Sequence, residues 1–168
     1  MMIRRVRLVL VVITLVVLQT TVFEHLVVFD ARPGLCLLAT IAIAYEEGPQ
    51  AGALFGFASG LLLDMFLSSP AGLSALSFAL TGYVLGVFQG GVMRESRGMA
   101  LVLGLVGGLI GGTIFVIVGG IAGMAGFFSG FSVRVVIVAA FYDSFLAPLV
   151  FPFMHWANHD PDRTRGWR

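Results

Sequence analysis

Few side chains in this sequence can do acid–base or ligand chemistry. The chain has 168 residues, of which 58% are hydrophobic and 11% are charged, whereas a soluble domain averages about 25% charged residues. Two aspartates stand out because apolar residues surround them: Asp64 follows the run GLLL, and Asp143 lies within VVIVAAFYDSFLAPLVF. A charged side chain at the centre of a bilayer costs about 2.5–3.5 kcal/mol. Each carboxyl group therefore needs compensation from hydrogen-bonding groups or water, and both are candidate site residues.

Asp64 lies directly before the turn SSPAG, which contains Pro70 and leads to Gly72. We expect its carboxylate to accept hydrogen bonds from backbone N–H groups of that turn, or of the next helix near Gly72 and Leu73. Contact with a partner protein is the alternative. A catalytic acid would also need a second positioned group and a cleft, and neither follows from the sequence.

Asp143 is the deepest ionisable residue that the sequence predicts. Ten helical steps from Val133 place it about 15 Å below the membrane surface, near the midplane. Tyr83 and Ser59 are predicted to reach a similar depth on other helices. We expect Asp143 to face the bundle interior and to hydrogen-bond to Tyr83 or Ser59. The alternative is a small wet cavity without a side-chain partner.

The remaining polar candidates lie near the outer end of the predicted bundle. One ion pair among Arg134, Glu24 and Asp64 would fix the rotation of their helices, although such a pair contributes only ~0–1 kcal/mol if exposed. A proton relay that uses His25 is the alternative. Gln19 is expected to hydrogen-bond to a neighbouring helix or to a partner.

Other kinds of site are excluded by spacing and position. The three histidines (His25, His155 and His159) fall at opposite predicted membrane faces, and Cys36 is the single cysteine, so no metal site and no disulfide are expected. There is no Walker loop and no Gly-x-Ser-x-Gly motif. The net charge of +1 and the scattered arginines do not suit nucleic acid. The sequence predicts no cofactor and no enzyme.

The elements that carry these residues are predicted to be transmembrane helices. The mean hydropathy is +1.00, and a helix needs about 20 apolar residues to span a bilayer. We predict an all-α polytopic membrane protein, with a single transmembrane domain over 1–158 and a short cytoplasmic polar tail over 159–168. The six predicted spans cover about 6–29, 33–45, 51–67, 72–92, 99–122 and 133–156.

The arginines orient this predicted bundle. All ten basic residues are Arg, and eight of them fall in cytoplasmic segments if the N-terminus is inside. Only Arg32 and Arg134 then lie outside. Since cytoplasmic loops carry the excess of basic residues, both termini are predicted to be cytoplasmic.

Glycine recurs at every fourth position in three of the predicted helices. Residues four apart share one face of a helix, and small residues let membrane helices approach closely. We therefore expect these stripes to pack the helices of the bundle against one another; binding of another protein's transmembrane segment is the alternative. The packing glycines are Gly52, Gly56, Gly60, Gly82, Gly86, Gly104, Gly108 and Gly112.

The stretch GALFGFASGLLLDMFLSSPAGLSALSFALTGYVLG resembles the hallmark region of the rod-shape-determining MreD family. It carries Gly-Leu-Leu-Leu-Asp ending at Asp64, Pro-x-Gly-Leu from Pro70, and Gly-Tyr-x-x-Gly from Gly82 to Gly86. VLQTTVF, which contains Gln19, and YDSFLAPLVFPFMHW, which contains Asp143, are similar to the family's first and closing helices.

This resemblance implies a non-catalytic integral scaffold of the bacterial cell-elongation complex, in the cytoplasmic (inner) membrane, that supports rod shape and lateral peptidoglycan synthesis. Its implied direct partner is the bitopic protein MreC. Implied indirect partners are a class B penicillin-binding protein, an SEDS glycosyltransferase and MreB, with membrane lipids around the bundle. The family's fold is similar to that of the S-components of energy-coupling-factor transporters.

That similarity supplies an alternative function, a solute-binding membrane subunit. S-components typically dock their energising partner through an Ala-x-x-x-Ala stripe on the first helix. Residues 6–29 contain neither Ala nor Gly, which favours the scaffold. A small channel or flippase is a third alternative.

Overall fold

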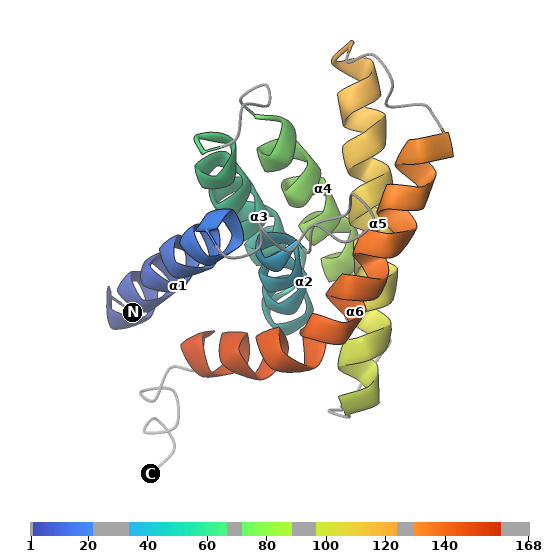
Figure 1. Ribbon diagram of the computed structural model, residues 1–168. Coiled ribbons are helices and arrows are strands. Elements are labelled where there is room, and N and C mark those ends of the chain that lie inside the picture. The colour runs from blue at the N-terminus through green and yellow to red at the C-terminus, as the bar shows by residue number, and fades with distance from the viewer. Residues whose placement is uncertain (1, 22–33, 67–71, 89–96, 124–129, 159–168) are drawn as a thin grey trace.

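A computed structural model describes the chain except for residues 1, 22–33, 67–71, 89–96, 124–129 and 159–168 (Figure 1). The described residues form helices and no strand, which confirms the predicted all-α class. The helices are α1 (Met2–Thr21), α2 (Leu35–Glu47), α3 (Pro49–Asp64), α4 (Leu73–Val87), α5 (Arg97–Ile121) and α6 (Gly130–Asn158).

Two helices in the described part are long and apolar enough to cross a membrane. They are Gly98–Ile121 within α5 and Ser132–Asn158 within α6. The apolar parts of α1 and α4 are shorter, α3 has 16 residues, and α2 has 13. The prediction of six spans is therefore not tested by helix length, and it stays a prediction.

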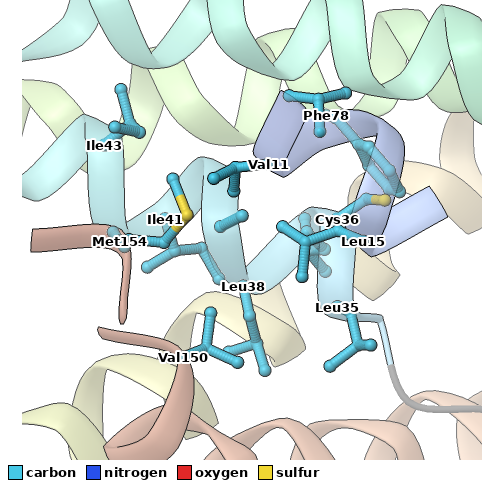
Figure 2. Close-up of a cluster of buried hydrophobic side chains, with 14 of the residues drawn as sticks. Val11, Leu15, Leu35, Cys36, Leu38, Ile41, Ile43, Phe78, Val150 and Met154 are labelled. Atoms are coloured by element: carbon cyan, nitrogen blue, oxygen red, sulfur yellow. The ribbon is translucent and has the colours of Figure 1, made fainter. Parts of the chain in front are cut away.

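The helix α2 lies at the centre of the molecule. Every residue from Leu35 to Ala44 is buried, and each of the other helices packs against α2 (Figure 1). Figure 2 shows Leu38 and Ile41 of α2 among Val11 of α1 and Met154 of α6. With 13 residues, α2 is about 20 Å long, well below the roughly 30 Å of a bilayer core.

Glycine and proline set the boundary between α2 and α3, in the gap between the predicted spans 33–45 and 51–67. Gly48 has a φ of 91°, which favours glycine, and Pro49 begins α3. Proline suits this position because the first N–H of a helix has no partner within it. One residue therefore joins two helices that pack closely.

The helix α6 bends before it ends. It contains Pro148 and Pro152, and proline removes a helical hydrogen bond and kinks the axis. In Figure 1 the last part of α6, drawn in red, runs beneath α2 towards α1. The sequence predicted a span to residue 156 without this change of direction.

Candidate functional site

Asp64 caps the N-terminus of α4. Its Oδ2 accepts hydrogen bonds from the backbone N–H groups of Gly72 at 2.8 Å, Ser74 at 3.1 Å and Ala75 at 3.2 Å. The carboxylate is buried, so it satisfies donors that have no partner within the helix. Gly72 has a φ of 99°, a left-handed conformation that lets the chain enter α4. The sequence predicted these hydrogen bonds.

The ion pair expected among Arg134, Glu24 and Asp64 stays a prediction, because Glu24 lies outside the described residues. In the part of the chain that the structure describes, the hydrogen bonds of Asp64 come from the backbone at the start of α4, and Arg134 is not among its partners. These backbone N–H groups stabilise the buried carboxylate of Asp64, a role that a cation could also have filled. Glu24, His25 and Pro70 lie outside the described residues.

Asp143 also caps a helix, but its expected partners are wrong. The side chain faces the interior as predicted and is 2% exposed. Its Oδ1 accepts a hydrogen bond from the backbone N–H of Gly34, at 2.8 Å, directly before α2. Tyr83 is 52% exposed, because it follows the packed Gly82 by about 100° around α4. Ser59 bonds instead to the Gly56 carbonyl and approaches the Thr40 hydroxyl.

Gln19 reaches the same helix end from α1. Its Oε1 accepts a hydrogen bond from the backbone N–H of Cys36, at 3.0 Å. The expectation that Gln19 bonds to a neighbouring helix is thus met, and the buried Cys36 takes part through its backbone. Asp143 and Gln19 together receive two of the N–H groups that α2 cannot satisfy by itself.

Glycine makes room for this cap. A Cβ atom built at Gly108 of α5 would lie 3.2 Å from Oδ2 of Asp143 and 2.9 Å from the Cα of Ala140. Any larger residue at position 108 would therefore push α6 and its carboxylate away from α5.

The glycine stripe of α3 is filled by α4. A Cβ at Gly56 would lie 2.4 Å from the Phe78 carbonyl oxygen, and a Cβ at Gly60 would lie 2.6 Å from the Cα of Ala75. Real Cβ atoms essentially never come so close to backbone, so no side chain fits there. A Cβ at Gly52, Gly82 or Gly86 would likewise lie less than 3.0 Å from backbone of a neighbouring helix.

The stripe of α5 faces α6 in the same way. The contacts there are made by Gly104 with Ala147, by Gly108 with Ala140, and by Gly112 with the Val136 side chain. The stripes therefore pack the chain's own helices, the first of the two alternatives raised by the sequence.

A family model for the rod shape-determining protein MreD matches residues 2–157. The chain belongs to the MreD family. No curated protein and no solved structure matches it. Membership associates this chain with the determination of rod shape and places it in a family of membrane proteins.

The MreD-family motif now has a structural meaning in this chain. Gly60 packs α3 on α4, Asp64 closes α3, Gly72 turns the chain, and Gly82 and Gly86 receive the backbone of α3. The motif describes one helical hairpin and its cap.

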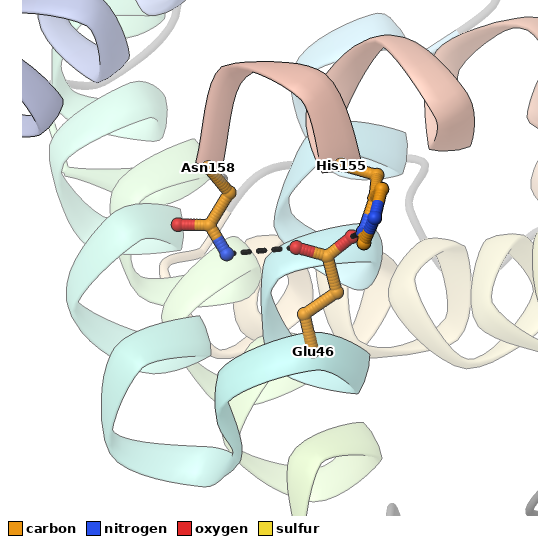
Figure 3. A network of polar contacts seen from close by, with 3 residues as sticks. All are labelled: Glu46, His155 and Asn158. Atoms are coloured by element: carbon orange, nitrogen blue, oxygen red, sulfur yellow. Dashed lines mark hydrogen bonds and ion pairs between the residues drawn. The ribbon is translucent and has the colours of Figure 1, made fainter. Parts of the chain in front are cut away.

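Sequence reasoning missed a polar cluster at the opposite end of the bundle. Glu46, at the end of α2, accepts a hydrogen bond from Nδ2 of Asn158 at 2.7 Å and contacts Nδ1 of His155 at 3.0 Å (Figure 3). The Arg7 guanidinium lies 5.2 Å from the centre of the Trp156 ring. The only available signal was that these residues are predicted to lie on the same side of the membrane.

The described residues offer little chemistry beyond these contacts. They include no group of three metal-ligand side chains. A surface hollow of about 350 Å³ is lined by Val138, Phe141, Tyr142 and Phe145 of α6, none of which is a carboxyl, imidazole or thiol group. The contacts described above fix the positions of the helices relative to one another.

Proposed function

We propose that this MreD-family chain is a non-catalytic, six-span scaffold in the bacterial cytoplasmic membrane that binds MreC and supports lateral peptidoglycan synthesis. The observation that carries the proposal is the family match over residues 2–157. The wider assembly, with the class B penicillin-binding protein, the SEDS glycosyltransferase and MreB, is reached through MreC.

The use of the buried carboxyl groups supports a non-catalytic role. Asp64 and Asp143 both accept hydrogen bonds from backbone N–H groups at helix ends. A general acid or base must instead be within reach of a substrate proton. Both groups act here as structural acceptors.

The arrangement of helix ends supports the six-span topology with both termini on one side. Arg7 of α1, Glu46 of α2 and Trp156 of α6 meet at one end of the bundle. Gly86, near the end of α4, lies against Pro49 at the start of α3. Helices α1 and α3 thus start, and helices α2, α4 and α6 end, on the side where the arginine-rich segments are predicted.

Co-purification tests the partner. The full chain is solubilised from its native membrane in a mild detergent and captured, and we expect MreC to co-elute. The Ala58→Leu variant is the control for handling, because Ala58 is exposed. Recovery of an ATPase pair with a bound vitamin, without MreC, would support the S-component alternative instead.

Cysteine labelling tests the topology independently. In a Cys36→Ala background, a membrane-impermeant maleimide should label Ser69→Cys in intact cells, because the loop at 68–70 is predicted to be extracytoplasmic. Labelling only after permeabilisation would show the inverse orientation.

A further inference from the structure

The helix α6 is longer than a membrane span requires. Its apolar segment Ser132–Asn158 has 27 residues, which as a straight helix extends about 40 Å. A bilayer core is about 30 Å thick. The excess of about 10 Å corresponds to roughly seven residues, and Pro152 is the first of the last seven residues of the helix.

This terminal segment, Pro152–Asn158, has two distinct faces. Met154 and Ala157 are fully buried against the bundle. Phe153 and Trp156 are 42% and 60% exposed, and their ring centres are 6.1 Å apart. The segment therefore leaves a pair of adjacent aromatic rings partly exposed, on the side opposite to its buried face.

The residues around these rings are of kinds that are typical of a membrane–water interface. Trp is enriched at the level of the lipid headgroups, where its ring is amphipathic. The Arg7 cation lies over the Trp156 ring, and its Nη1 is 3.5 Å from the Trp156 carbonyl oxygen, which places a positive charge where anionic headgroups would lie. Glu46 holds the segment to α2 through His155 and Asn158 (Figure 3).

We infer that Pro152–Asn158 is an interfacial segment that lies along the inner headgroup layer, with Phe153 and Trp156 inserted at the boundary between headgroups and acyl chains. The bend at Pro148 and Pro152 turns the chain out of the span at the depth where the hydrocarbon ends. The occupant of this aromatic face is lipid. The inference requires that α6 spans the membrane, and it does not depend on binding to MreC.

Depth measurements with nitroxide labels test this inference. In a Cys36→Ala background, single cysteines at Phe145, Leu149, Phe153 and Trp156 are labelled in the full chain. The protein is reconstituted in vesicles of phosphatidylethanolamine and phosphatidylglycerol, and depth is obtained from accessibility to oxygen and to a water-soluble nickel complex.

The control pair, positions 145 and 149, should differ in depth by about 6 Å, as expected within a span. Positions 149 and 156 should differ by less than about 4 Å, with the 153 and 156 labels open to oxygen. A straight helix would give about 10 Å for that second pair and would overturn the inference. A 156 label open mainly to nickel, or closed to both reagents, would show water or a protein partner in place of lipid.

A second measurement covers the case in which Trp156→Cys does not fold. Trp156 is kept, Trp167→Phe removes the other tryptophan, and the vesicles contain lipids brominated near the headgroup or near the chain ends. Stronger quenching by the shallow bromines is expected. Absence of quenching by either lipid would contradict the inference.

Discussion

Asp64 and Asp143 perform the same physical task in two regions that are built differently. Asp64 caps α4 from a position 8 to 11 residues before the N–H groups that it receives. Asp143 caps α2 across 109 residues of sequence. The first cap belongs to the α3–α4 hairpin, whose parts are adjacent in the chain; the second belongs to the α2–α6 junction, which exists only when the bundle has assembled.

The two regions differ in how many groups depend on the carboxylate. The backbone N–H groups of Gly72, Ser74 and Ala75 all donate to Asp64. Among the described residues, Asp143 accepts one such bond, from Gly34, and Gln19 accepts the bond from the nearby Cys36. The stability of the hairpin should therefore depend strongly on a single hydrogen-bond acceptor, Asp64. The stability of the junction should instead depend on two acceptors, Gln19 of α1 and Asp143 of α6.

The largest expected effect comes from the close packing of the hairpin. Gly60→Leu places a side chain where even a Cβ would lie 2.6 Å from the backbone of Ala75, so α3 and α4 must separate. We expect a loss above about 3 kcal/mol, beyond ordinary overpacking, and a loss of monodisperse protein on size-exclusion chromatography. Ala58→Leu, on the exposed face, should behave as wild type; equal yields for the two variants would contradict this.

Removal of the carboxyl groups should rank the two caps. Asp64→Leu leaves three N–H groups without their acceptor and should cost about 3 kcal/mol, whereas Asp143→Leu leaves one and should cost about 1–2 kcal/mol. The free energy of unfolding in mixed micelles, titrated with dodecyl sulfate, measures both. A larger loss for Asp143→Leu would reverse the comparison.

Replacing each aspartate by asparagine should give a smaller difference in stability between the two caps. Asp143→Asn keeps one acceptor oxygen for the single Gly34 N–H group and should cost less than about 1 kcal/mol. Asp64→Asn places an amide N–H₂ group where Oδ1 now accepts from Ser74 and loses the charge at the helix N-terminus, so about 1–2 kcal/mol is expected. Equal losses of unfolding free energy for the two variants in the same titration would indicate that the number of accepted hydrogen bonds does not determine the cost.

The smallest expected effect concerns Tyr83. Because its ring is half exposed and Asp143 bonds to Gly34 instead, Tyr83→Phe should change stability by less than about 0.5 kcal/mol. Its cost should be the same in wild type and in Asp143→Leu, as a double-mutant cycle would show. A coupling above about 1 kcal/mol would restore the Tyr83–Asp143 pair.

The sequence by itself determined the local features of this protein. It predicted the helix break between residues 45 and 51, the packing face of each glycine stripe and the cap by Asp64. In each case the residues that form the pattern lie within a few turns of one another, so helical periodicity and turn chemistry fix their relative positions. The family motif is readable for the same reason, since it covers one hairpin.

Only the tertiary structure decided which groups meet across the bundle. Counting residues along α6 predicted a depth for Asp143, and the cost of a carboxylate at that depth predicted that it faces inward. Neither argument contains the rotation of α4, which turns Tyr83 outward, or the level at which α2 begins. Because α2 is short and enters between the other helices, its first N–H groups lie within reach of Asp143 and Gln19. Likewise, the bend of α6 brings His155 and Asn158 to Glu46. Such pairings depend on the relative placement of separate rigid helices, which no local pattern encodes.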